Sequence, residues 1–397
     1  MCFRLVHKQH WVVNGFLVVG AEYMAKAKPR AFSAVSITMM VALSANLFLG
    51  CQFLQPASAQ VVRDDQPQAH GQSNLPDVPI SVWHDQEVKP NAVAVCVHGL
   101  AMHGRVYDRM ARVLARQGFV VYAQDLRGYG RWQEKSLRAL AGDERLADIN
   151  EREQSITVSE PTTLADDGSR VAEVSYGQSF EDLKEVIQAA RHEYPSLPLF
   201  LIGESLGAGL SLHAAEMMPG SVSGLVLSSP ALKRRLYIAP EVVKDFSTLV
   251  TRPHRQCDLS PYIKKLSSED PRIVEEELND PYIRKHMTCA DMLKTFSMIK
   301  SNLDYARGVS ADIPVLVIQG DHDRILKQNA VVLLLDRLKC KDQTVRWLSG
   351  KGHVLIETAL IEPSTLGTIS SWLIDHLPDG NMVQAQNTSE PDKAQSN

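Results

Sequence analysis

The sequence predicts an α/β fold built on a mostly parallel, doubly wound sheet. Two observations indicate this class. Short apolar runs alternate with segments of helical periodicity between residues 92 and 376, as in repeated β-α units. Most of these runs are continuously apolar, so both faces of each strand are expected to be buried. Burial on both faces favours parallel strands that are covered by helices on either side.

The expected strands are, in chain order, 92–97, 119–123, 199–202, 224–228, 313–318 and 344–348. The expected helices are 106–117, 180–194, 206–217, 328–339 and 364–376. One face of the first helix carries Val106, Met110, Val113 and Leu114. That helix is expected to end at Gly118, because glycine is the usual residue after a helix. The second helix presents Leu183, Val186, Ile187 and Ala190 on one face.

Two segments interrupt the alternation, and each follows the carboxyl end of an expected strand. Residues 133–176 are polar and partly helical in pattern, and we interpret them as an accessory insertion. Residues 233–310 are mainly helical in pattern and are expected to form a cap between strands 6 and 7 of the sheet. The core domain then consists of 78–232 and 311–378. Because ligands bind at the carboxyl ends of parallel strands, both segments are expected beside the functional site.

The amino-terminal residues 1–59 have the order of a secretory leader. Basic residues at 26–30 precede an uncharged run at 31–50, and small residues follow at 56–59. A cut after Ala59 would release a soluble chain. Cys51 offers a second outcome, since Leu-Gly-Cys resembles a lipoprotein cleavage box, and an uncleaved anchor is a third. An exported, periplasmic or cell-envelope protein, with a lipid anchor at Cys51 as one alternative, is therefore expected.

Two further segments are polar and are expected to lack fixed structure. Residues 60–77 contain Pro, Gln and Asp and are interpreted as a disordered linker. Residues 379–397 are rich in Asn, Gln, Ser and Asp and are interpreted as a disordered tail. About 300 residues remain between them, which suits one large α/β domain with insertions.

Charge and cysteine usage exclude several classes. The 42 basic and 46 acidic residues give a net charge of −4 without a basic block, which argues against nucleic acid as a partner. The six cysteines form no C-x-x-C pair and no spacing suited to zinc, so no metal is expected. A disulfide between Cys257 and Cys289 is conceivable in an exported protein. Single packing or surface cysteines are the simpler interpretation.

Residues 203–207 read Gly-Glu-Ser-Leu-Gly and lie between an expected strand and an expected helix. In that setting G-x-S-x-G predicts a nucleophile elbow. The turn is so sharp that Gly203 and Gly207, two residues before and after the serine, must lack bulk. The hydroxyl of Ser205 then projects at the amino end of the helix. Ser205 is therefore the candidate nucleophile.

A serine nucleophile needs a base, and the chain order serine, acid, histidine is expected in this kind of fold. The loop after the last expected strand contains His353, which would accept the proton of Ser205. The loop after the preceding strand contains Asp321 and Asp323. Either acid would fix the tautomer of the histidine and stabilise its charged form. His322 is a rival base, although adjacent residues seldom point at each other.

Acyl transfer also requires an oxyanion hole. One expected donor is the backbone N–H of Leu206, the residue after the nucleophile. The other is assigned to the N–H of Leu100, in the loop after strand 92–97 that opens with His98 and Gly99. Such donors contribute about 3 kcal/mol each to stabilising the transition state.

These motifs resemble those of the α/β-hydrolase superfamily, and within it the group of monoacylglycerol lipases, lysophospholipases and S33 serine aminopeptidases. The resemblance spans roughly 79–377 and is carried by His98-Gly99-Leu100, Asp125-Leu-Arg-Gly-Tyr-Gly130, Gly203-Glu-Ser-Leu-Gly207, Gly320-x-x-Asp323-Arg324 and Gly352-His353-Val354. The G-x-x-D pattern of the group selects Asp323 as the acid. The resemblance implies a serine enzyme without a cofactor, which hydrolyses esters of acyl chains, as in lipids, under a helical cap.

The chain departs from the group at three places. Gly-Ala-Gly at 207–209 replaces the usual Gly-Gly, and Glu204 stands where histidine is common. Neither change is expected to touch the catalytic groups. The insertion at 133–176 is longer than usual, so it is expected to influence the choice of substrate.

Two other functions remain open. An aminopeptidase would keep the same three residues and bind a substrate ammonium with an acid of the cap, for which Asp270 and residues 275–277 are candidates. A binding module without catalysis would use the fold alone. Such proteins usually lose a catalytic residue, whereas all three are present here.

Overall fold

The structure is a computed structural model that describes residues 60–68, 74–133, 162–164, 170–232 and 252–378. The expected leader at 1–59 and the expected tail at 379–397 lie outside the described residues. Within the described ranges, no helix has the length and hydropathy needed to cross a bilayer.

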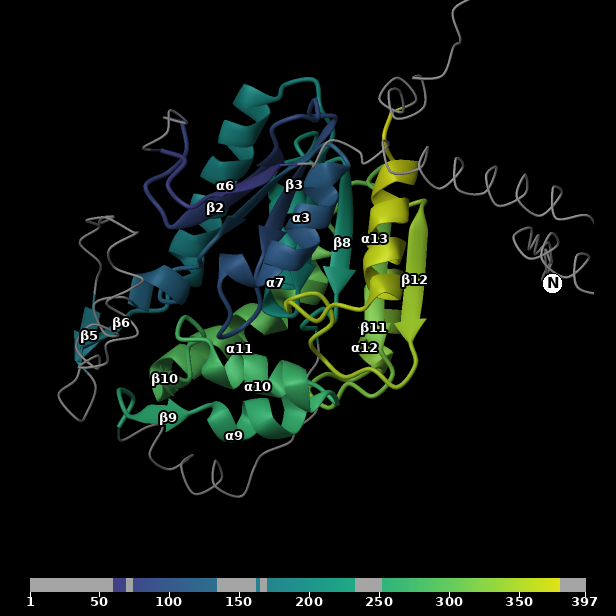
Figure 1. The fold of residues 1–397 in the computed structure, drawn as a ribbon. Helices are drawn as coiled ribbons and strands as arrows, with labels where there is room; N and C mark the ends of the chain where they lie inside the picture. The colour runs from purple at the N-terminus through teal and green to yellow at the C-terminus, as the bar shows by residue number, and fades with distance from the viewer. Residues whose placement is uncertain (1–59, 69–73, 134–161, 165–169, 233–251, 379–397) are drawn as a thin grey trace, which may run out of the picture. The chain divides into compact units, whose positions relative to one another are not determined.

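An eight-stranded sheet forms the centre of the protein, in the order β1-β2-β4-β3-β7-β8-β11-β12 (Figure 1). Its strands are β1 Val61–Asp64, β2 Ile80–Asp85, β3 Ala92–Val97, β4 Phe119–Gln124, β7 Leu199–Glu204, β8 Gly224–Ser228, β11 Val315–Gly320 and β12 Gln343–Leu348. All neighbours from β4 to β12 are parallel. Only the pairs β1–β2 and β2–β4 in this sheet are antiparallel. The sheet is therefore mostly parallel, as predicted.

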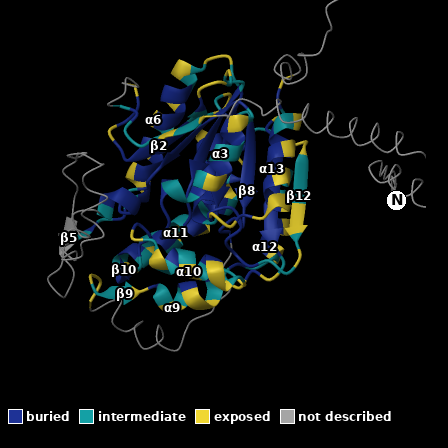
Figure 2. Cartoon of the chain, in the orientation of Figure 1, coloured by how far each residue is buried: buried dark blue, intermediate teal, exposed yellow. Residues whose placement is uncertain are grey.

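Helices cover both faces of the sheet. They are α3 Asp108–Arg116, α6 Tyr176–Glu193, α7 Leu206–Met217, α12 Asn329–Arg337 and α13 Pro363–Asp375. Ala92, Ala94 and Cys96 of β3 pack in one apolar cluster with residues of α3 and α13. The valines between them pack in a second cluster with residues of α6, α7 and α12. Figure 2 shows the buried central strands beneath helices that are exposed on their outer sides, while the edge strand β12 is partly exposed. The doubly wound prediction is confirmed.

The predicted elements agree closely with the observed ones. β3, β8 and α7 have the predicted bounds. Helix α6 begins earlier than predicted, at Tyr176, because the hydroxyl of Ser175 accepts a hydrogen bond from the N–H of Gln178 and caps the helix. The remaining predicted elements shift by only a few residues at their ends.

The prediction of a disordered linker over 60–77 is wrong for part of that segment. Residues Val61–Asp64 form β1, which pairs with β2, a strand that the apolar pattern also missed. Asp65, directly after β1, connects this strand to its neighbours, because it accepts a hydrogen bond from Ser81 of β2 and forms an ion pair with Arg105. A partly exposed edge strand held by backbone bonds and charges leaves no apolar pattern in the sequence.

The cap is inserted between the sixth and seventh strands of the sheet, β8 and β11, as predicted. Its described part contains β9 Gln256–Asp258, α9 Ser260–Tyr262, a π-helical turn at Ile263–Ser267, α10 Pro271–Asn279, β10 His286–Thr288 and α11 Cys289–Tyr305. β9 and β10 form an antiparallel pair. The arrowheads of β8 and β12 point toward the end of the domain where α10 and α11 lie (Figure 1). The first part of the expected cap, 233–251, lies outside the described residues.

The accessory insertion predicted at 133–176 is described only near its end. There β5 Thr162–Leu164 and β6 Arg170–Ala172 form an antiparallel pair. The rest of the predicted insertion, at 134–161 and 165–169, lies outside the described residues, so its partly helical pattern stays a prediction.

Candidate active site

The candidate site lies where the winding of the sheet changes direction. From β3 the chain continues to β4 on one side, and it later places β7 on the other side. β3 and β7 are parallel neighbours, and Val97 at the end of β3 pairs with Gly203. Ligands of open α/β sheets bind where the loops of two such strands diverge. These two loops carry the predicted oxyanion hole and the predicted nucleophile.

Ser205 occupies the sharp turn between β7 and α7. Its φ of 55° and ψ of −113° are strained for a residue with a side chain. A Cβ atom at Gly203 would collide with the backbone of Gly207, and one at Gly207 would collide with the carbonyl of Val97. Both glycine positions therefore exclude a side chain, as a nucleophile elbow requires.

The structure brings Ser205, His353 and Asp323 together in one line of hydrogen bonds. The Oγ atom of Ser205 lies 2.9 Å from Nε2 of His353. On the other side of the ring, Nδ1 of His353 lies 2.8 Å from Oδ2 of Asp323. The histidine and the acid are both buried. This arrangement can pass a proton from the serine to the imidazole and can stabilise the imidazolium that results.

The carboxylate of Asp323 is held in place by four donors. Its Oδ1 atom accepts the N–H groups of Ile325 and Leu326, and its Oδ2 atom accepts from Gln319 as well as from His353. Burial alone would raise the pKa of Asp323, but the charge of His353 and these hydrogen bonds lower it to about 2. Asp323 is therefore ionised at neutral pH.

The alternative acid Asp321 and the alternative base His322 do not belong to this line of hydrogen bonds. Asp321 accepts a hydrogen bond of 2.6 Å from the N–H of Gly350, so it supports the loop that leads to His353. His322 is exposed. The structure therefore pairs His353 with Asp323, the acid that the G-x-x-D resemblance selects.

The cap contacts the loop that carries His353. The carbonyl oxygen of Ser267 accepts hydrogen bonds from the N–H groups of both His353 and Val354, at 3.1 and 3.0 Å. A carboxylate oxygen of Glu269 accepts from the N–H of Gly352. Glu276 accepts from the N–H of Ala359 at 2.8 Å. The position of the candidate base thus depends on backbone groups and acids of the cap.

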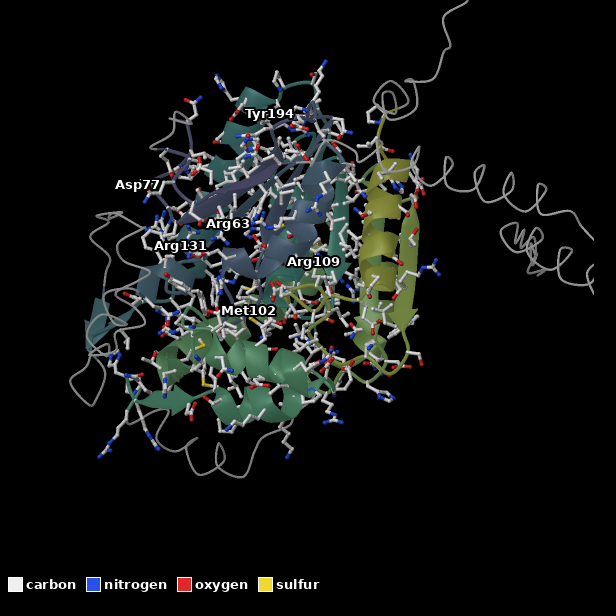
Figure 3. The ribbon with its side chains drawn as sticks, viewed as in Figure 1. Arg63, Asp77, Met102, Arg109, Arg131 and Tyr194 are labelled. Atoms are coloured by element: carbon white, nitrogen blue, oxygen red, sulfur yellow. The ribbon has the colours of Figure 1, made fainter. Side chains whose placement is uncertain are left out.

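The predicted oxyanion donors border the same space. Leu206 is the first residue of α7, and the first N–H groups of a helix lack partners within the helix. Gly99 lies close to the serine, because a Cβ atom placed on it would come within 3.4 Å of Cβ of Ser205. Leu100 follows Gly99 directly. Figure 3 places Met102, from the same loop, where the sheet meets the cap helices.

His98 and Asp125 shape the loop after β3. The Nε2 atom of His98 accepts the N–H of Leu126 at 2.9 Å, while Nδ1 donates to the carbonyl of Gly99. Burial lowers the pKa of His98 to about 4, so the ring is neutral in this role. Asp125 accepts the N–H of Gly104 at 2.8 Å. The predicted supporting residues His98 and Gly99 are therefore part of the loop that presents Leu100.

Glu204 is a supporting residue whose partners the sequence analysis did not identify. Its carboxylate, fully buried beside the nucleophile, accepts the N–H groups of Leu355, Ile356 and Glu357 at 3.0, 3.3 and 3.0 Å. It also accepts the hydroxyl of Ser228 at 2.6 Å. Through these hydrogen bonds Glu204 holds the segment after His353 against the nucleophile elbow. None of these hydrogen bonds goes to Ser205, His353 or Asp323 themselves, so the expectation that this departure leaves the catalytic groups untouched stays a prediction.

Glu357 extends this connection to the oxyanion loop. Its Oε1 atom accepts the N–H of Gly99 at 2.6 Å and the hydroxyl of Tyr107 at 2.9 Å. Burial and the charge of Glu204 raise the pKa of Glu357 well above its usual range. Two buried acids therefore tie together the elbow, the histidine loop and the oxyanion loop. For Glu204 the sequence did contain a signal, because an acid at the end of a buried strand needs hydrogen-bond partners.

Replacing Glu204 with glutamine is expected to destabilise the fold by about 2 kcal/mol, because one oxygen becomes an NH₂ group that faces a backbone N–H. The hydroxyl of Ser228 can turn to accept, but the backbone donors cannot. Thermal unfolding should show the loss of stability, and kcat should fall with it. Glu185→Gln, on the exposed side of α6, is the matched control and should change neither quantity. An unchanged Tm in Glu204→Gln would contradict this role.

The candidate acids for an ammonium differ in their surroundings. Glu275 is exposed, Asp270 pairs with Arg272 at the surface, and Glu276 accepts the N–H of Ala359. Glu277 is buried within electrostatic range of His353. Burial raises the pKa of Glu277 to about 8. Its Oε1 atom is buried and makes no hydrogen bond among the described residues.

No group of three or more His, Cys, Asp or Glu side chains suited to a metal ion occurs in the part of the chain that the structure describes.

The chain is similar to several known proteins. The family model of the serine aminopeptidase, S33, matches residues 88–358. The chain is 25% identical over 303 residues to a monoacylglycerol lipase of Mycolicibacterium smegmatis, covering 75% of this chain and 92% of the relative. It is 23% identical over 293 residues to the human monoglyceride lipase, covering 72% of this chain and 82% of the relative.

Solved structures share its fold. The monoacylglycerol lipase of Paleococcus ferrophilus superposes with a TM-score of 0.54 at 22% identity, over 75% of this chain and 99% of that one. A carboxyl esterase of Bacillus coagulans superposes with a TM-score of 0.55 at 20% identity, over 76% and 95%. With the family model matching more than half of its length, the chain belongs to the serine aminopeptidase S33 family of α/β-hydrolases.

Proposed function

We propose that the protein hydrolyses carboxylic esters of medium or long acyl chains, of the monoacylglycerol or lysophospholipid class. The observation that carries the proposal is the line of hydrogen bonds from Ser205 through His353 to Asp323, 2.9 and 2.8 Å long, at the switch point of the sheet. The protein is an ester hydrolase of the serine type. Its similarity to lipases and an esterase supports the lipid-ester substrate.

In the proposed reaction, Oγ of Ser205 attacks the ester carbonyl carbon while Nε2 of His353 accepts the serine proton. The N–H groups of Leu100 and Leu206 donate hydrogen bonds to the oxyanion that forms. His353 then gives the proton to the departing alcohol, which leaves an acyl ester on the serine. Water, deprotonated by His353, hydrolyses that acyl-enzyme and restores the serine. Asp323 stays ionised throughout and orients the imidazole.

The activity is expected to rise with pH through the titration of His353. Burial would lower the pKa of His353, but the charge of Asp323 and the hydrogen bond to it outweigh burial and raise the pKa above its ordinary value of 6.5. Protonated His353 cannot accept the serine proton, so kcat/KM should be low in acid and reach half its maximum above pH 6.5. A pH profile of kcat/KM on a neutral ester measures this midpoint, and a midpoint below pH 6 would contradict the assignment.

The substrate class is tested by incubating the purified full chain with monoolein and measuring the release of oleic acid. Ser205→Ala serves as the blank. Release that is lost in the variant supports both the serine mechanism and the lipid-ester substrate. A folded wild-type enzyme that releases acid from p-nitrophenyl butyrate but not from monoolein would overturn the lipid-ester proposal and leave the serine mechanism standing.

Aminopeptidase activity is a second candidate, because Glu277 of the cap presents a buried oxygen without a hydrogen bond near the candidate base. An ammonium group needs a charged carboxylate, yet burial raises the pKa of Glu277 to about 8, so binding an ammonium there would carry the cost of ionising a buried carboxyl. The ester substrate is therefore favoured. Release of arylamine from an amino-acid arylamide, without ester turnover, would reverse this preference.

A non-catalytic binding module is the third candidate and is not favoured. The described site has the three groups that serine hydrolysis needs, because the candidate nucleophile, base and acid are all present and hydrogen-bonded.

The proposed location is outside the cytoplasm, in the periplasm or cell envelope. The support is the order of basic, uncharged and small residues within 1–59. The intact mass of the mature chain, purified from cells of its source, tests this location. A mass that begins at residue 60 indicates a soluble chain, a lipid-modified Cys51 indicates an anchor, and an unprocessed chain in the cytoplasm would contradict export.

A further inference from the structure

Two cysteines that are 32 residues apart in the sequence meet in the cap. The Sγ atoms of Cys257 and Cys289 lie 3.6 Å apart, and the two residues are not joined by a disulfide. Cys257 lies in β9, and Cys289 is the first residue of α11, directly after β10. The backbone also connects these segments, because the N–H of Cys289 donates to the carbonyl of Arg255 over 3.1 Å.

We propose that Cys257 and Cys289 form a thiol–disulfide site, which a disulfide oxidant converts into a covalent clamp across the cap. The antiparallel pair β9–β10 already holds the two segments, with Cys257 opposite Met287. The sulfur atoms need only approach from 3.6 Å to about 2 Å. Rotation of the two short side chains can supply a movement of this size.

The two thiols differ in access, and this assigns their roles. Cys257 is partly exposed, whereas Cys289 is buried. With glutathione disulfide as the oxidant, the Cys257 thiolate attacks one sulfur, forms a mixed disulfide and expels one glutathione thiolate. The Cys289 thiolate then attacks the sulfur of Cys257 and expels the second. The protein loses two protons and two electrons, and the oxidant gains them as two glutathione thiols.

The disulfide would enclose, in a covalent loop, the part of the cap that contacts the histidine loop. The closed segment 257–289 includes Ser267, whose carbonyl accepts the N–H of His353, and Glu276, which accepts the N–H of Ala359. Closing a loop of this length restricts the unfolded chain and is expected to raise the Tm by about 5 °C. The proposal does not rest on the identity of the substrate, and its test does not use turnover.

The test exposes the folded full chain to glutathione disulfide, alkylates the remaining thiols and digests the protein with trypsin without reduction. Cleavage after Arg255, Lys264, Lys285 and Lys294 yields peptides 256–264 and 286–294. These two peptides should appear joined, with the loss of two hydrogen atoms. Cys257→Ser and Cys289→Ser should each abolish the joined product, while Cys340→Ser, at a buried cysteine of another region, should retain it.

Two results would overturn the proposal. One is recovery of both peptides separately alkylated after exposure to the oxidant. The other is a lasting glutathione adduct on Cys257, since it would mean that Cys289 cannot reach the mixed disulfide. The clamp itself is checked by comparing the Tm of oxidised and reduced wild type. An oxidised protein with an unchanged Tm would refute its stabilising effect.

Discussion

Replacing Ser205 with alanine is expected to lower kcat for ester hydrolysis by about a millionfold. The substitution removes the proposed nucleophile, the Oγ atom, and the 2.9 Å hydrogen bond to His353 disappears with it. The variant keeps a Cβ atom at the strained turn, so the elbow and α7 should fold as before. Fatty-acid release, labelling by a fluorophosphonate and the Tm together measure the effect.

The matched control for this variant is Ser211→Ala in the same helix. Ser211 is also buried, but its hydroxyl donates to the carbonyl of Gly207 and does not face His353. It should retain fluorophosphonate labelling and most of the activity. Labelling that persists in Ser205→Ala would place the nucleophile elsewhere and contradict the proposed mechanism.

The fold was predictable because its central strands are continuously apolar and its helices have one apolar face. β3, for example, alternates residues between two buried clusters, so every position along it is apolar. β1 and β2 escaped prediction for the opposite reason. β1 is a partly exposed edge strand, and β2 contains Ser81, His84 and Asp85, which interrupt an apolar pattern.

The candidate nucleophile, base and acid were predictable because each follows a recognisable strand in a glycine-containing loop. The supporting acids were not. The carboxylate of Glu357 accepts a hydrogen bond from Gly99, which lies 258 positions earlier in the sequence. No local sequence pattern predicts a contact between residues so far apart. Glu204 is inside the motif itself, yet its partners are backbone N–H groups of residues 355–357, which any sequence would supply. The meeting of Cys257 with Cys289 likewise depended on how β9 and β10 pair.

Replacing Asp323 with asparagine is expected to lower kcat by about 10⁴-fold, because it stabilises the wrong tautomer of His353. The Oδ1 atom of Asp323 accepts two fixed backbone N–H groups, from Ile325 and Leu326. The amide oxygen of asparagine must therefore take that position, which leaves its NH₂ group facing Nδ1 of the imidazole. Nδ1 then has to accept, so the proton moves to Nε2, and Nε2 can no longer accept the proton of Ser205.

Asp321→Asn is the natural control for this variant, since Asp321 lies two residues away and its carboxylate accepts the N–H of Gly350 in the histidine loop. It should lose less than about tenfold in kcat, in line with one weakened hydrogen bond. Asp323→Asn should also lower the pKa of His353, because it removes the charge that raises that pKa most strongly. The acid limb of the pH profile should then shift to lower pH in this variant alone. Equal losses in the two variants, with no shift of that limb, would mean that Asp323 only supports the loop and that the base is oriented by another group.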